Sequence, residues 1–82
     1  MGIEQFLSAD DKRAALEEVK GLLEKEIYFL CMKHGLDPED VDPDTFAVEG
    51  IVNPNPVAMV NYRIIETHCK NLVAVKAKLA SM

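Results

Sequence analysis

Apolar residues recur at intervals of three and four in two stretches of the chain, residues 9–34 and residues 56–80. Spacing of this kind places side chains on one face of an α-helix. The sequence therefore predicts two helices of about 25 residues, each about 38 Å long. The apolar positions that form the two stripes are Leu16, Val19, Leu23, Ile27, Leu30, Val57, Val60, Ile64, Leu72, Val75 and Leu79. We expect these residues to form the core or a self-association surface.

Local signals mark the beginning of both helices. Ser8 can cap the first helix, because its hydroxyl can accept a hydrogen bond from a free amide of the first turn. Asn55 is an equally good cap for the second helix, and Pro56 suits the first helical position. Between the helices, residues 35–55 contain Asp-Pro and Asn-Pro pairs, which favour turns. We expect residues 1–82 to form one helical domain with an ordered, turn-rich connector.

The two helices carry more apolar residues than one hairpin can bury. The main apolar positions outside the stripes are Leu22, Phe29, Met32, Ala58, Met59, Ile65, Cys69 and Val73. Large exposed apolar patches mark interfaces, and the simplest closed assembly is a two-fold homodimer. The predicted fold is therefore all-α, an antiparallel helical hairpin that pairs into a dimeric four-helix bundle. The alternative is a monomer whose connector and N-terminal residues cover the second apolar face.

Net charge and composition exclude several classes of function. The 82 residues carry 14 acids and 9 bases, a net charge of −5, which opposes direct binding to nucleic-acid phosphates. No apolar run reaches the roughly 18 residues of a membrane span, so no membrane association is expected. The N-terminus lacks the basic and apolar regions of a signal peptide. Two cysteines are too few for a disulfide framework, so a cytoplasmic location is expected.

The acidic residues are concentrated in the first part of the chain. Residues 1–49 hold 13 acids and 5 bases, whereas residues 50–82 hold 1 acid and 4 bases. In the connector, the candidate residues for docking a basic protein partner are Asp37, Glu39, Asp40, Asp42 and Asp44, with Phe46 as an apolar anchor. The alternative is that these acids serve as turn caps and solvated surface.

One stretch of the connector begins like a calcium-binding loop. Residues 40–44 alternate Asp with other residues, which is the oxygen spacing that a hard cation prefers. However, Thr45 stands where the loop needs Gly, and Ile51 stands where it needs a bidentate Glu. The sequence therefore predicts no calcium site.

Four residues are of the types that bind zinc. Cys31 and His34 share one helix face, whereas the neighbours His68 and Cys69 point about 100° apart. In a simple hairpin, residue 68 lies about 18 Å from the start of the second helix, while residues 31–34 lie near that start. We therefore expect the two pairs not to converge within one chain, and we predict no metal or cofactor.

Catalytic motifs are also scarce. The sequence has no glycine-rich phosphate loop, no G-x-S-x-G turn and no nucleophile beside an evident base. His68 lies within the second apolar stripe, where we expect a hydrogen-bonded or edge-exposed core residue; the alternative is a pH-sensitive interface residue. The sequence therefore predicts that the protein is not an enzyme.

These observations favour a small, acidic, non-enzymatic protein-interaction module that acts as an adaptor, inhibitor or assembly factor. Its surfaces would be the acidic connector and the apolar helix faces. A second possibility is a structural subunit of a larger particle, such as a phage component. A third is an inhibitor that mimics DNA, although the basic second helix counts against a broadly acidic face.

Overall fold

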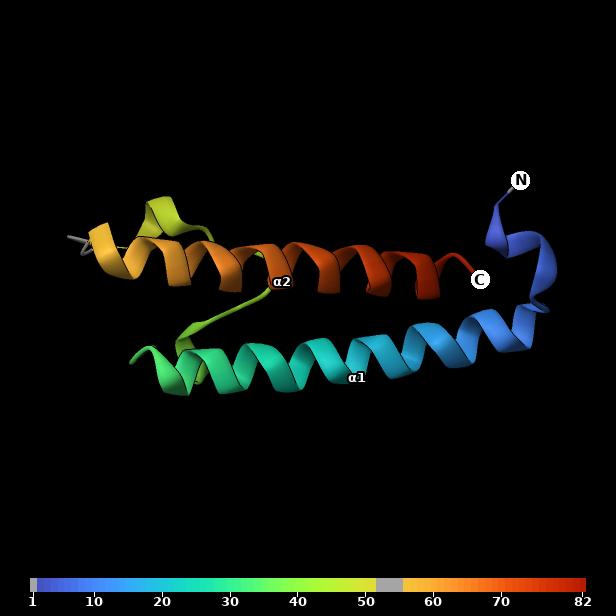
Figure 1. Ribbon diagram of the computed structural model, residues 1–82, viewed down its shortest axis with the longest axis horizontal. Helices are drawn as coiled ribbons and strands as arrows, with labels where there is room; N and C mark the ends of the chain where they lie inside the picture. The colour runs from blue at the N-terminus through green and yellow to red at the C-terminus, as the bar shows by residue number, and fades with distance from the viewer. Residues whose placement is uncertain (1, 52–55) are drawn as a thin grey trace.

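The protein forms two long antiparallel helices joined by a connector that contains short helical turns (Figure 1). The computed structural model describes residues 2–51 and 56–82, except for the side chain of Val57. The elements in chain order are η1 (Ile3–Phe6), α1 (Ala9–Lys33), η2 (Pro38–Asp40), η3 (Val48–Gly50) and α2 (Pro56–Ala80), where η marks a 3-10 helix. Every element in these two ranges is helical, and α1 packs against α2. The all-α prediction is confirmed, while pairing into a dimer stays a prediction.

The ends of α1 follow the local signals in the sequence. The Ser8 hydroxyl accepts a hydrogen bond from the amide of Asp11 at 3.1 Å, as expected for a capping residue. At the other end, Gly35 has a φ of 77°, a left-handed conformation that glycine adopts without strain. The amide of Leu36 then donates to the carbonyl of Cys31 at 2.9 Å, which closes the helix in a Schellman arrangement. The cap predicted at Asn55 lies outside the described residues.

The core lies in the half of the helix pair where the connector packs. Its buried cluster consists of Ile27, Leu30, Cys31, Ile65, Cys69 and Leu72. Half-buried residues of α1, α2 and the connector pack against this cluster, namely Leu23, Leu36, Val41, Phe46 and Tyr62. Farther along the helices, Leu16, Val75 and Leu79 are half-buried. Within the described part of the chain, neither helix is apolar enough over a bilayer-spanning length to be a candidate transmembrane segment.

The structure buries only part of the stripes that we expected to form the core or a self-association surface. Val19, Val60 and Ile64 are 42%, 65% and 42% exposed, so they are not part of the core of the chain. The buried face of α2 passes instead through Ile65 and Cys69, which are 0% and 1% exposed. Apolar residues occur around much of α2. Spacing alone therefore allowed a buried stripe through Ile64 or one through Ile65, which lie about 100° apart on the helix. Packing against α1 and the connector buries the stripe through Ile65. The side chain of Val57, another residue of the predicted stripe, is not among those that the structure describes.

The connector is ordered by contacts with both helices over the described residues. η2 packs against α1 and η3 packs against α2. In Figure 1 the connector leaves the end of α1 and passes behind α2 to reach η3. The opposite face of the helix pair, turned toward the viewer, is therefore crossed by neither η2 nor η3. This asymmetry determines which apolar side chains stay exposed.

Candidate interaction surfaces

The face of the helix pair opposite the connector carries exposed apolar side chains from both helices. On α1, Glu24 lines a depression together with connector residues, and Leu22 points about 160° away from it, since a helix turns about 100° per residue. On α2, Glu66 contacts η3, and Ile64 likewise points about 160° away. We name this surface the open face, and its exposed apolar residues are Val19, Leu22, Phe29, Val60 and Ile64.

His68 lies at the border between the core and the open face. It follows Ile64 by one helical turn and is half-buried. Its Nδ1 atom is buried and has no hydrogen-bond partner among the described residues. His68 therefore lies at the edge of the core. This agrees with the expected edge-exposed residue, although Nδ1 makes no hydrogen bond to the described residues. A role in a pH-sensitive interface stays a hypothesis.

The acids of the connector are mostly engaged within the chain. Asp37 Oδ1 accepts a hydrogen bond from the amide of Glu39, and Asp42 Oδ1 accepts one from the amide of Asp44, both at 3.0 Å. The carboxylate of Asp44 also pairs with the Lys76 ammonium at 3.3 Å. These acids act as turn caps and as a tie to α2, which is the alternative that the sequence left open. Glu39 and Asp40 present exposed carboxylates beside them.

Phe46, the predicted apolar anchor, lies against the helices and is only partly accessible. Its side chain is half-buried and packs against the core cluster. The amide of Phe46 donates to the carbonyl of Asp42 at 2.8 Å, which turns the chain so that the ring faces the helices. Burying an aromatic ring next to the core is favourable. The contact of Phe46 with the core cluster helps to order the connector, and docking of a partner at Phe46 stays a prediction.

Glu66 is a structural residue that the sequence analysis missed. It is 8% exposed, and its Oε2 accepts a hydrogen bond from the amide of Val48 in η3 at 2.8 Å. The Lys70 ammonium lies 3.4 Å from Oε1, and the Arg63 guanidinium lies 3.9 Å from it. The Val48 hydrogen bond and these two cations lower the pKa of Glu66 below 4.5, against the opposing effect of burial. The available sequence signal was that Glu66 is the only acid in residues 50–82.

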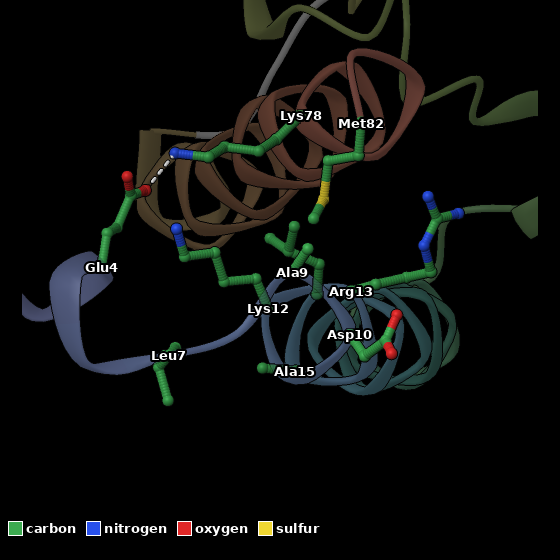
Figure 2. A pocket seen from close by; sticks show the side chains of 10 residues that line it. Glu4, Leu7, Ala9, Asp10, Lys12, Arg13, Ala15, Lys78 and Met82 are labelled. Carbon is green, nitrogen blue, oxygen red and sulfur yellow. Dashed lines mark hydrogen bonds and ion pairs between the residues drawn. The ribbon is translucent and has the colours of Figure 1, made fainter.

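A groove of about 550 Å³ lies at the end of the helix pair where both termini gather. Figure 2 shows Lys78 reaching Glu4 of η1 on one side, with Arg13 and Asp10 on the other. The ion pair and hydrogen bond with Lys78 lower the pKa of the exposed Glu4 carboxyl. The lining includes apolar side chains but also both signs of charge. This groove can accommodate part of a partner surface.

The two cysteines meet in the core, which corrects the expectation that their neighbourhoods stay apart. Cys31 and Cys69 are free thiols and belong to the same buried cluster, because Ile65 and Cys69, rather than the first turn of α2, pack against Cys31. Burial raises the pKa of both thiols, that of Cys69 to about 11. The thiols are therefore protonated and unreactive at neutral pH. Among the described side chains, no three His, Cys, Asp or Glu residues are arranged to hold a metal ion.

Neither a protein-family model nor a curated protein nor a solved structure matches this sequence. The chemistry of the candidate surfaces consists of apolar side chains on the open face, carboxylates on the connector side and a mixed groove at one end. Such surfaces are suited to binding other macromolecules.

Proposed function

We propose that the protein is a small non-enzymatic protein-interaction module that works as a homodimer and serves as an adaptor, inhibitor or assembly factor. The observation that carries this proposal is the open face, where five large apolar side chains, each at least 42% exposed, lie on two packed helices. Pairing two such faces yields a four-helix bundle, the usual way to bury a second helix face. The buried free thiols suit a reducing compartment such as the cytoplasm.

Sedimentation or light scattering tests the dimer directly. We expect twice the monomer mass for the natural protein, and Ile64→Glu should raise the dimer dissociation constant on the order of a hundredfold, because an unpaired carboxylate would be buried. The matched control is Val73→Glu. Val73 is 38% exposed and follows Glu66 by seven residues, so it lies on the connector side. A monomeric natural protein at high concentration would contradict the proposal, and open-ended assembly would indicate a structural subunit instead.

The connector provides a second surface, on the side away from the proposed dimer contact. Glu39 and Asp40 are exposed there and can attract a basic protein segment while the open face is occupied. Replacing both with Gln and Asn should weaken binding of a Lys- and Arg-rich peptide about two- to tenfold, with a weaker salt dependence. Fluorescence anisotropy at several ionic strengths measures this change. The control removes the same charge from α1 through Glu17→Gln and Glu18→Gln; equal weakening in both variants would remove the connector from the proposal.

A further inference from the structure

We infer that Cys31 of α1 and Cys69 of α2 form a reversible disulfide that joins the two helices when the surroundings become oxidising. The bond lies inside one helix pair, so it is independent of the proposed dimer. In the reduced protein both thiols are free. Their burial, their level along the helices and their position relative to the connector all point to this pairing.

Both cysteines lie in the contact between α1 and α2. Cys31 is 0% exposed and Cys69 is 1% exposed, and they belong to one buried cluster whose members all come from the two helices. Burial raises the pKa of Cys69 to about 11, and the charge of a Cys31 thiolate adds to this increase. An effect of one charge on another group in this way requires that the two sulfur atoms lie near each other.

The two cysteines lie at the same level along the helix pair. Glu24 and Lys76 together line two depressions between α1 and α2, which places these two residues at one level. The helices are antiparallel (Figure 1) and rise equally per residue, so seven residues forward from Glu24 lies opposite seven residues back from Lys76. These positions are Cys31 and Cys69.

Two packed helices bring such facing positions close enough for a disulfide. Helix axes pack about 8–10 Å apart, and Cα atoms lie about 2.3 Å from each axis. Cα atoms that face each other across the contact therefore come within about 7 Å, which is the range that a disulfide requires. Because Cys31 and Cys69 are buried on the inner sides of their helices, their side chains point into this contact.

Bond formation uses a low-molecular-weight disulfide, such as oxidised glutathione, as the oxidant. The thiolate of one cysteine attacks it, which forms a mixed disulfide and releases one glutathione thiolate. The second cysteine thiolate then attacks the protein sulfur of the mixed disulfide, which forms the bond between Cys31 and Cys69 and releases the second glutathione. Two protein thiols are thus oxidised, one glutathione disulfide is reduced, and the two protons from the protein pass to the released thiolates. Because the thiols are buried and protonated, the exchange requires local opening and is slow at neutral pH.

The bond closes the chain from Cys31 to Cys69 into a loop that contains η2, η3 and the first turns of α2. Closing a loop of this length restricts the unfolded chain and thereby stabilises the folded one. A small domain with a short list of fully buried side chains gains a large share of its stability from such a link. Reduction returns the two free thiols, so the stability of the helix pair responds to the redox state.

Equilibrium with glutathione measures whether the fold favours the bond. The natural protein is equilibrated with mixtures of reduced and oxidised glutathione, once in native buffer and once in guanidinium chloride, and is then quenched with acid and analysed by intact mass spectrometry. The ratio of oxidised to reduced protein gives the effective concentration of one thiol at the other. We expect the native value to exceed the unfolded value on the order of a hundredfold, because the bond stabilises the fold by as much as the fold stabilises the bond. A native value equal to or below the unfolded value would overturn the inferred pairing.

The double variant Cys69→Ala with Ile64→Cys is the matched control. It keeps two cysteines, but position 64 lies on the open face, about 140° around α2 from Cys69. Ile64 is 42% exposed, so the new side chain is tolerated, and circular dichroism verifies the fold. Its native effective concentration should fall below its unfolded value, since the fold holds these thiols apart. A control that matches the natural protein would overturn the register between Cys31 and Cys69.

Thermal unfolding provides a second readout. The oxidised natural protein should melt roughly 10–20 °C above the reduced protein, whereas Cys69→Ala should melt at the same temperature after either treatment. An unchanged or lower melting temperature of the oxidised protein would overturn the stabilising effect. A disulfide between two chains, detected as a doubled mass, would overturn the pairing within one chain.

Discussion

Replacing Ile65 with alanine is expected to lower the free energy of unfolding by about 2–5 kcal/mol. Ile65 is 0% exposed and belongs to the cluster that joins α1 to α2. Truncation removes three buried carbons and leaves a cavity where the surrounding helices cannot fully relax. Since a small domain has a total stability of about 5–15 kcal/mol, this one change removes a large share of it. Urea unfolding followed by circular dichroism measures the effect.

The neighbouring Ile64→Ala variant is the matched control. Ile64 is 42% exposed, and the same truncation there should cost about 1 kcal/mol or less when the protein is dilute. The loss at Ile65 should not depend on protein concentration. The proposed dimer further predicts that the loss at Ile64 grows with concentration, because binding between copies would stabilise the folded state. A larger loss at Ile64 than at Ile65 in dilute protein would contradict the core that the structure shows.

Replacing Glu66 with glutamine is expected to loosen η3 and to reduce the acid sensitivity of the protein. The carboxylate accepts the Val48 amide and lies beside Lys70 and Arg63, and the neutral side chain loses both ion pairs. Hydrogen exchange at the Val48 amide should therefore become faster on the order of tenfold. NMR-detected exchange measures this directly. The control is Glu49→Gln, since the exposed Glu49 carboxylate pairs with Arg63, whereas the Val48 amide donates to Glu66.

The pH dependence follows from the lowered pKa of Glu66. Its folded-state pKa lies below the ordinary value of 4.5, so its contribution to stability is present above about pH 4.5 and is lost as the pH falls through the folded-state pKa. Glu4 also has a lowered pKa and contributes a remaining slope in the same range. Unfolding measured between about pH 6 and pH 2 should therefore show a shallower loss in Glu66→Gln. An unchanged slope would mean that the carboxylate does not stabilise the connector.

Local features of the fold were predictable because they depend on neighbouring residues. Periodic spacing located both helices, and the predicted bounds of 9–34 and 56–80 differ from α1 and α2 by a single residue. Ser8 acts as the expected cap, and the Asp-Pro pairs form turns in which Asp37 and Asp42 bond to amides two residues on. Capping and turn formation involve atoms a few residues apart, so sequence is sufficient for them.

The surfaces were predictable only in part. The excess of apolar residues indicated that some would stay exposed, and those that do include Val60 and Ile64. Spacing alone did not separate these two residues from the members of the stripes that are buried. The connector acids were identified, but their use as caps and the burial of Phe46 depend on how the connector packs. Glu66 was missed because its role requires Val48, which is 18 positions away in the sequence.

By itself, the sequence determined two helices, their ends, the turns between them and a surplus of apolar side chains. Only the tertiary structure decided which side of α2 faces α1 and which face of the pair the connector covers. The physical reason is that helix formation and capping are satisfied by bonds within a few residues. The choice of a buried stripe on a helix that is apolar on several sides depends on contacts between distant segments, here Ile65 with α1 and Glu66 with η3.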